Sequence, residues 1–201
     1  LKAFYNTRMA QTWREVGEQP DWQRLYDKRE LYSIGTVPQG GLLITCGIDV
    51  QKEGIYYEYV AWGRRKESWS LDKGYIAGDI ETDDMRDRVY QLADRLFKSH
   101  TGVDMPVERT AIDSGYKSQF VYGVVREYGS DRLTAVKGEQ EGNLTTIIGT
   151  PTPVDVNIDG QRITRGLMLW KVGSSVIKEQ IYSWLGTVKP TDEELKAGRL
   201  Y

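Results

Sequence analysis

The sequence predicts an α/β fold with a mixed central sheet, in which an antiparallel meander is followed by parallel strands and flanked by helices. Three runs rich in aromatic and β-branched residues follow one another between residues 42 and 76, separated by short polar turns. From residue 82 onward, helical hydrophobic spacing alternates with short apolar runs, which is typical of parallel βαβ units. A chain of 201 residues is long enough to form one such domain around a single core.

Each predicted element follows from a local pattern. The three runs are strands at Leu42–Val50, Ile55–Trp62 and Ser68–Ile76, and their closeness in sequence predicts antiparallel pairing. Thr82 is a good N-cap for a helix whose apolar residues keep helical spacing to about Ser99. The remaining predicted elements, in chain order, are a strand at Val107–Asp113, a helix through Tyr128, a strand at Leu133–Lys137, a hairpin turning at Asp159–Gly160, a strand at Gly166–Val172 and a helix at Ser174–Leu185.

Two aspartates stand at the carboxyl ends of predicted strands. Asp49 lies in Gly47-Ile48-Asp49-Val50, and Asp113 ends the fourth strand, directly before a Ser-Gly turn. A carboxylate beside a buried strand is costly unless a cation or hydrogen-bond donors compensate it. Aspartates also form turns and cap helices after strands, which is the alternative interpretation. The matched placement of the two side chains nevertheless predicts a divalent metal site.

Basic side chains that could contact DNA are local, because 27 basic residues face 29 acidic ones. A protein that holds DNA by charge alone would be strongly basic. The densest patch is Arg64-Arg65-Lys66 in the second turn, which could touch DNA phosphates, although a solvated turn explains it equally well. Lys137 and Lys178 could neutralise a phosphate, with ordinary solvated lysines as the alternative.

The single cysteine, Cys46, excludes an internal disulfide and a Cys-based zinc site, and its place in the first strand predicts a buried reduced thiol. No apolar stretch approaches the roughly 20 residues of a membrane span. We therefore expect a soluble intracellular protein with no membrane partner.

The predicted layout resembles the ribonuclease H-like fold, which holds two divalent ions between acidic residues. Several short motifs, in the same order along the whole chain, resemble the nuclease half of lambda-type phage terminase large subunits. They are Phe4-Tyr5-Asn6-Thr7, Gly47-Ile48-Asp49-Val50-Gln51, Trp62-Gly63, Ile112-Asp113-Ser114-Gly115, Val136-Lys137-Gly138 and Val172-Gly173 with Lys178.

The resemblance implies an endonuclease that cuts concatemeric double-stranded viral DNA in the host cytoplasm. In that family a packaging ATPase domain precedes the nuclease, and the chain shows no Walker A pattern. We therefore expect residues 1–41 to be an arm from a preceding ATPase domain, and residues 42–201 to be an endonuclease domain truncated at its C-terminus. The implied partners are DNA, the ATPase domain of the same polypeptide, the small terminase subunit and the portal.

The resemblance also implies two Mg²⁺ or Mn²⁺ ions, with Asp49 bridging both, Asp113 holding one and Lys178 assisting catalysis. Lys137 and the patch Arg64-Arg65-Lys66 would contact DNA. The family's third acidic residue is not apparent before Tyr201, so it lies further along, or Glu58 or the cluster Asp192-Glu193-Glu194 replaces it.

Two other classes of function remain open at this point. A non-catalytic docking domain of the packaging machine would tolerate removal of both aspartates. An ATPase like actin and the sugar kinases shares the fold, and saturable nucleotide binding would favour it, although a second glycine-rich phosphate loop is missing from the sequence.

Overall fold

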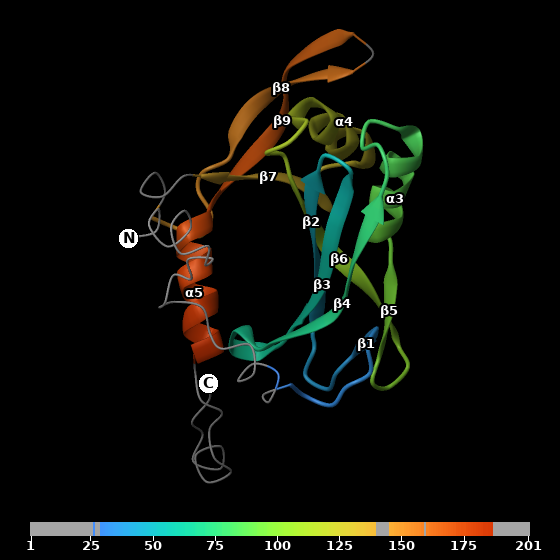
Figure 1. Cartoon of the computed structure of the whole chain (residues 1–201), viewed down its shortest axis with the longest axis vertical. Coiled ribbons are helices and arrows are strands. Elements are labelled where there is room, and N and C mark those ends of the chain that lie inside the picture. The colour runs from blue at the N-terminus through green and yellow to red at the C-terminus, as the bar shows by residue number, and fades with distance from the viewer. Residues whose placement is uncertain (1–25, 27–28, 140–144, 159, 187–201) are drawn as a thin grey trace, which may run out of the picture. The chain divides into compact units, whose positions relative to one another are not determined.

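The computed structural model describes residues 26, 29–139, 145–158 and 160–186. The chain divides into two compact units, Leu31–Val176 and a second that contains residues 1–30 and 177–201. The first unit holds the sheet and the helices that position the candidate site (Figure 1). Most of the predicted arm, residues 1–41, falls outside the described residues, so its boundary at residue 42 stays a prediction.

A mixed sheet forms the centre of the first unit, with its main strands in the order β4-β3-β2-β6-β7-β9-β8. Neighbours β4, β3 and β2 pair antiparallel, whereas β2, β6, β7 and β9 run parallel. The fold class predicted from the sequence is confirmed, and it is compatible with a ribonuclease H-like fold. The bounds are β2 Leu43–Gln51, β3 Gly54–Trp62, β4 Ser68–Ala77, β6 Asp104–Asp113, β7 Leu133–Glu139, β8 Thr152–Ile158 and β9 Gln161–Gly173.

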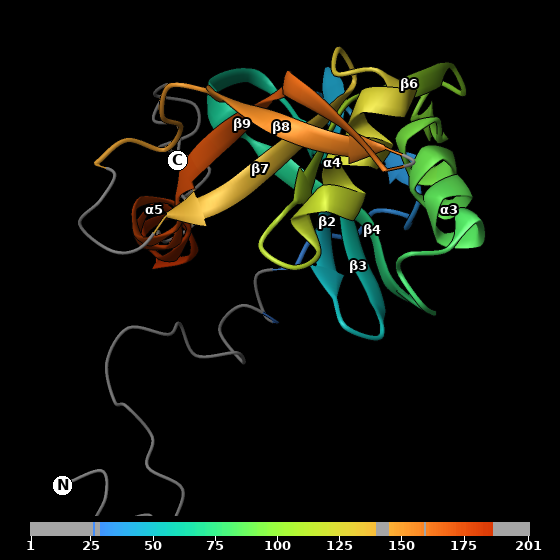
Figure 2. The ribbon, with the colours of Figure 1, turned by 90° about the horizontal axis from the view of Figure 1, so that it is seen from above.

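Alternation along β2 separates a core face from an exposed face. Ile44, Cys46, Ile48 and Val50 are buried, and the residues between them, among them Asp49, are exposed or partly so. Two helices, α3 (Asp83–Ala93) and α4 (Ser118–Tyr128), add their apolar residues to the same core, and Figures 1 and 2 show both on one side of the sheet. We call the opposite side, which carries Asp49, the exposed face. The buried reduced thiol predicted for Cys46 is confirmed.

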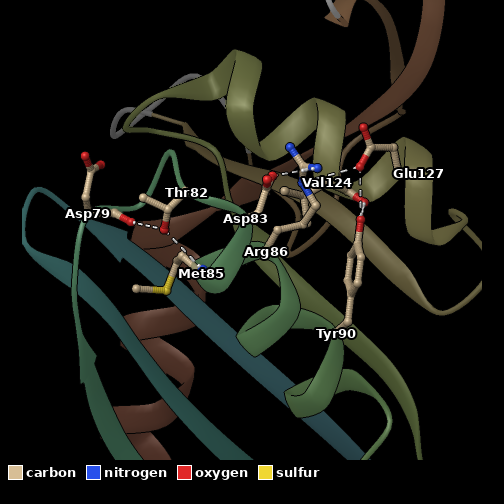
Figure 3. Close-up of polar contacts among 8 residues, drawn as sticks. All are labelled: Asp79, Thr82, Asp83, Met85, Arg86, Tyr90, Val124 and Glu127. Atoms are coloured by element: carbon tan, nitrogen blue, oxygen red, sulfur yellow. Dashed lines mark hydrogen bonds and ion pairs between the residues drawn. The ribbon is translucent and has the colours of Figure 1, made fainter.

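Polar contacts join α3 to the loop before it and to α4 (Figure 3). The Thr82 hydroxyl accepts from the Met85 N–H at 3.3 Å, so the predicted N-cap is confirmed. On the next turns, the Glu127 carboxylate of α4 accepts from Tyr90 at 3.3 Å and pairs with Arg86 at 3.4 Å. These contacts fix the helical layer against which β2 and β6 are packed.

The first predicted helix is shorter in the structure than in the sequence prediction. It ends at Ala93, and Leu96–Ser99 forms strand β5, which pairs with β6 and with the short β1 (Thr36–Val37). The reason is Arg95, whose guanidinium pairs with Asp72 at 2.5 Å and lies over the rings of Tyr59 and Phe97. Leaving the helix lets Phe97 enter the core, where it is 2% exposed.

Two further differences concern the strands. The fourth predicted strand begins at Asp104 rather than Val107, and β9 is one continuous strand instead of two short ones. The predicted hairpin is present, with Ile158 opposite Gln161. The last described helix, α5, spans Ser174–Gly186, and no helix in the described ranges is long and apolar enough to cross a membrane.

One irregularity in β6 matters for the site. Ile44 pairs with Val107, but the next residue, Thr45, pairs with Arg109, so Glu108 is an extra residue on β6. Such a bulge reverses the side-chain alternation of one strand relative to its neighbour.

Candidate functional site

The two predicted aspartates occupy neighbouring positions at the carboxyl ends of two adjacent parallel strands. Ile48 of β2 pairs with Ile112 of β6, so Asp49 and Asp113 stand at the next position of each strand. Side chains at matching positions of parallel strands point to the same face, and adjacent strands are about 4.8 Å apart. The structure therefore brings both carboxylates together on the exposed face.

Asp113 is held in place by the turn that follows it. The buried Ser114 donates to the Val136 carbonyl from its backbone N–H at 2.8 Å and from its hydroxyl at 2.9 Å, which ties the ends of β6 and β7 together. The next N–H, that of Gly115, donates to Asp113 Oδ1 at 3.2 Å. A methyl group at Gly115 would lie 3.0 Å from Asp113 Oδ2, so a side chain there would displace the carboxylate.

Burial raises the pKa of Asp113 above its usual range, and the negative charge of Asp49 raises it further. Backbone hydrogen bonds from Gly115 and Ser114 and the positive charge of Lys137 act in the opposite direction. Two ionised carboxylates at neighbouring positions repel each other, and this disfavours the charged form of Asp113. Lys137 follows Val136, the partner of Asp113 on β7, so strand alternation directs its side chain to the other face of the sheet, and its positive charge acts on Asp113 from there.

Asp49 is more exposed than Asp113. Gln51, two residues further along the same face of β2, donates from Nε2 to Asp49 Oδ2 at 2.7 Å. On the other side stands Gly47, where an added methyl group would meet no atom within 4 Å. The Asp49 carboxylate therefore borders open space in which a ligand can approach it.

The other sequence-predicted residues lie away from this pair or outside the first unit. Arg64–Lys66 form a short 3-10 helix after β3, beyond Trp62, which pairs with Leu43 at the far end of β2 from Asp49. The structure does not bring this patch to the carboxylates. Lys178 lies on α5 within the second compact unit, and its role stays a prediction.

A family model for the endonuclease domain of the terminase large subunit gpA matches residues 1–196. The chain belongs to this endonuclease family. The large terminase subunits of Escherichia phage lambda and Enterobacteria phage P21 are 28% and 30% identical to it over 196 residues. Each match covers 96% of this chain and 29% of the relative, so the chain spans less than a third of these terminase subunits.

Among solved structures, two crystal structures of Ppx/GppA family members from Aquifex aeolicus are 12% identical to the chain, with a TM-score of 0.29. They cover 77% and 78% of this chain, which covers 58% and 60% of them.

For a member of the terminase endonuclease family, the position of a third acidic ligand is of interest. Glu58 of β3 lies on the exposed face and pairs with Gly47, which precedes Asp49 by two residues on β2. The Glu58 carboxylate accepts a hydrogen bond from Ser70 Oγ at 2.6 Å. Within the described ranges, no three His, Cys, Asp or Glu side chains are grouped to hold a metal ion. Asp192, Glu193 and Glu194 lie outside those ranges.

Sequence reasoning missed two tyrosines, Tyr56 and Tyr75, that continue the row of the two carboxylates across the exposed face. Tyr56 of β3 pairs with Asp49, and Tyr75 of β4 pairs with Tyr56. Both were part of the aromatic richness that predicted strands. The alternation along the second strand was the available signal, because it places Tyr56 and Glu58 on the face opposite buried Tyr59.

Proposed function

We propose that this domain is a metal-dependent endonuclease that hydrolyses phosphodiester bonds of double-stranded DNA during viral packaging. The observation that carries the proposal is the placement of Asp49 and Asp113 one residue beyond the paired Ile48 and Ile112, at the carboxyl ends of β2 and β6 and on the exposed face. Membership in an endonuclease family favours this activity over a kinase-like ATPase.

The residues at the site suit Mg²⁺ or Mn²⁺. Both are hard cations that prefer carboxylate oxygens, and they leave positions for water and phosphate oxygens. Burial raises the pKa of Asp113 and repulsion by Asp49 raises it further, and this repulsion is relieved when a cation lies between the two carboxylates. In two-metal sites the ions activate water and stabilise the attacking and leaving oxygens.

The side chains have distinct parts in this proposal. Asp49, which borders open space, would bridge two ions, and Gln51 would hold its second oxygen in place. Asp113 would hold one ion, oriented by the Gly115 N–H. Lys137 would supply positive charge near the scissile phosphate, and Lys178 would be a further catalytic residue.

Arg64–Lys66 would contact DNA well away from the cut. The last residue of β3, Trp62, pairs with Leu43 of β2. Leu43 precedes Asp49 by six residues, so the end of β3 that leads to the patch lies about 20 Å along the strand from Asp49. That length corresponds to about six base-pair steps of duplex. The patch would thus position the DNA along the sheet rather than take part in the chemistry.

The remaining parts of the proposal concern the whole packaging machine. The proposed partners are the packaging ATPase domain of the same polypeptide, the small terminase subunit and the portal, in the cytoplasm of the host cell. A third acidic ligand, from Glu58 or from residues beyond the described ranges, would complete the metal site.

Plasmid cleavage with Mn²⁺ tests the activity. We expect the purified chain to nick and linearise plasmid, and Asp49→Asn and Asp113→Asn to lose this activity while keeping the circular dichroism spectrum of the native chain. Glu108→Gln, which neutralises another exposed carboxylate on β6, is the matched control and should cut normally. Undiminished cutting by a folded Asp49→Asn variant would contradict the proposed site.

A further inference from the structure

Four side chains form one row across the exposed face at the carboxyl ends of β2 and β6. Asp113 and Asp49 occupy matching positions, Tyr56 pairs with Asp49, and Tyr75 pairs with Tyr56. Paired residues on neighbouring strands share a face, and each strand adds about 4.8 Å. The Tyr56 ring therefore begins about 5 Å from Asp49, and the Tyr75 ring about 10 Å from it.

The two tyrosines form a pair that remains accessible to solvent. Their ring centroids lie 4.6 Å apart at an interplanar angle of 37°. Tyr56 is 53% exposed and Tyr75 is 44% exposed. Large aromatic surfaces on an exposed sheet face, next to a polar site, mark a binding surface more often than an isolated exposed side chain does.

The backbone next to the pair fixes its geometry. The Tyr75 hydroxyl donates to the Glu53 carbonyl at 2.7 Å. Its ring lies over Gly54, where a methyl group would come within 2.8 Å of the hydroxyl oxygen. Gly54 has φ of 152°, so both its conformation and the missing side chain leave room for the ring. Tyr75 is thus held before any ligand arrives.

The chemistry of the row indicates what the pair binds. Nucleobases stack on exposed aromatic rings without regard to sequence, because every base has a π face. When the scissile phosphate lies beside Asp49 and Asp113, the adjoining nucleotides are within reach of a ring about 5 Å away, and stacking on that ring needs no cation. Lys73, exposed in the next row opposite Glu58, adds a cation for the DNA backbone.

We propose that Tyr56 and Tyr75 bind a nucleobase of the strand being cut, next to the scissile phosphate, after that base has left the duplex stack. The proposal rests on the endonuclease function proposed above. It adds an unpaired base as a ligand of the site. The two tyrosines would be positioning residues, which hold the DNA strand next to the scissile phosphate without taking part in the chemistry. DNA in which the base beside the cut is already unpaired should bind more tightly than perfect duplex, whatever the base.

Fluorescence of 2-aminopurine tests the proposal without cleavage. The probe is a duplex with a short single-stranded gap that contains 2-aminopurine, titrated with the 201-residue chain in EDTA. We expect stacking on the tyrosines to quench the fluorescence, and Tyr56→Ala to abolish quenching and to weaken binding about tenfold. Tyr56→Phe keeps the ring and should quench normally.

Leu96→Ala is the matched control, because Leu96 is 57% exposed and pairs with Pro106, seven residues before Asp113 on β6. It should bind and quench like the native chain. If Tyr56→Ala fails to fold, Tyr56→Thr retains a strand-forming residue and replaces it. A purely structural tyrosine pair would lower the melting temperature of the variant and leave quenching by the folded protein unchanged, which would overturn the proposal.

The outcome is separable from the endonuclease test. Asp113→Asn should stop plasmid cleavage and leave quenching of the gapped probe in place. If Asp113→Asn cuts plasmid normally, the proposed metal site is wrong. The base site is still supported in that case if Tyr56→Ala alone loses quenching of the probe. If Tyr56→Phe loses quenching as Tyr56→Ala does, the hydroxyl rather than the ring binds DNA, and the stacking proposal is wrong.

Discussion

Asp113 is the residue at which the electrostatics of the candidate site can be measured. Its neighbour on β6, Ile112, is a core residue, whereas its carboxylate lies partly buried beside the negative charge of Asp49. Hydrogen bonds from the Gly115 and Ser114 N–H groups lower the pKa of Asp113, but burial and the charge of Asp49 outweigh them, so the pKa is raised. Without a cation, the ionised form of Asp113 therefore destabilises the fold.

We expect Asp113→Asn to raise the free energy of unfolding at neutral pH in EDTA. The unfolded carboxyl titrates near its usual value of 3.8, and the folded one titrates above it. As the pH rises through that interval, the unfolded state loses its proton first, so the native chain loses stability and the variant does not. Urea unfolding at several pH values should show that the free energy of unfolding of Asp113→Asn exceeds that of the native chain at pH 7, and that this difference disappears below pH 3.8.

Asp155→Asn provides a control of opposite sign. The Arg165 N–H and the Arg162 guanidinium lower the pKa of Asp155, so its ionised form stabilises the fold above the usual carboxyl pKa and this contribution is lost as the pH falls. This variant should lose stability at pH 7 and match the native chain in acid. A gain at pH 7 from Asp155→Asn, or none from Asp113→Asn, would contradict these assignments.

Mn²⁺ should reverse the effect of Asp113 on stability. We expect the melting temperature of the native chain to rise with Mn²⁺ concentration, because a ligand that binds only the folded state adds about 2.7 kcal/mol at 100 times its dissociation constant. Asp113→Asn should show a much smaller rise, and Glu108→Gln the full rise. Differential scanning fluorimetry measures these melting temperatures. Equal rises with Mn²⁺ in all three proteins would show that Asp113 is not a ligand of the metal site.

At the scale of the elements, the turn between β6 and α4 links the fold to the site. Ser114 is tied to β7 through Val136, and Gly115 leaves space for the carboxylate before it. Neither residue is a candidate ligand. Both determine where Asp113 points, and this is why the Asp-Ser-Gly sequence after the strand is informative.

Gly115→Ala should therefore weaken Mn²⁺ binding about tenfold, as changes to groups that orient metal ligands commonly do. The added methyl group would stand 3.0 Å from Asp113 Oδ2, and the carboxylate would move to avoid it. Calorimetric titration measures the affinity. Gly123→Ala, inside α4 where a methyl group meets no atom within 4 Å, should leave Mn²⁺ affinity unchanged and stabilise the fold by about 0.5–1 kcal/mol. Equal affinities in both variants would contradict the role of Gly115.

Much of the element order could be predicted from the sequence because the strands and helices have strong local periodicity. The strand β5 could not, since Leu96 and Phe97 continue the helical spacing, and only the contacts of Arg95 with Asp72 and the two rings favour leaving the helix. The two aspartates could be selected because they follow apolar strands. Their pairing, and the presence of Tyr56 beside them, depend on strand register, which local patterns do not contain.

At the scale of the whole molecule, charge is distributed rather than concentrated. The chain has a net charge of −2, and the basic residues proposed to contact DNA belong to separate elements: Arg64–Lys66 after β3, Lys73 on β4 and Lys137 on β7. The chain spans 29% of the length of its phage relatives.

DNA binding by this chain should be salt-dependent and nearly independent of sequence. Five phosphate contacts, from Arg64, Arg65, Lys66, Lys73 and Lys137, give a slope of about −4.5 for log K against log salt. Arg64→Gln should reduce the slope by about 0.9, whereas Lys98→Gln, at a lysine paired with Asp104 on a different strand, should not change it. Fluorescence anisotropy with two unrelated duplexes measures both quantities. Salt-resistant binding to one duplex alone would contradict this expectation.

The extra residue Glu108 has a consequence for the kinds of change in chain length that the domain can tolerate. Without it, the residues of β6 that follow would exchange faces, so Asp113 would point into the core and Ile112 into solvent. Any insertion or deletion of one residue between the bulge and the end of either strand has the same effect. Such a lesion removes apolar residues from the core at the same time as it separates the carboxylates. Selection against misfolding alone would therefore preserve the alignment of the two aspartates, even during periods when DNA cutting is not under selection.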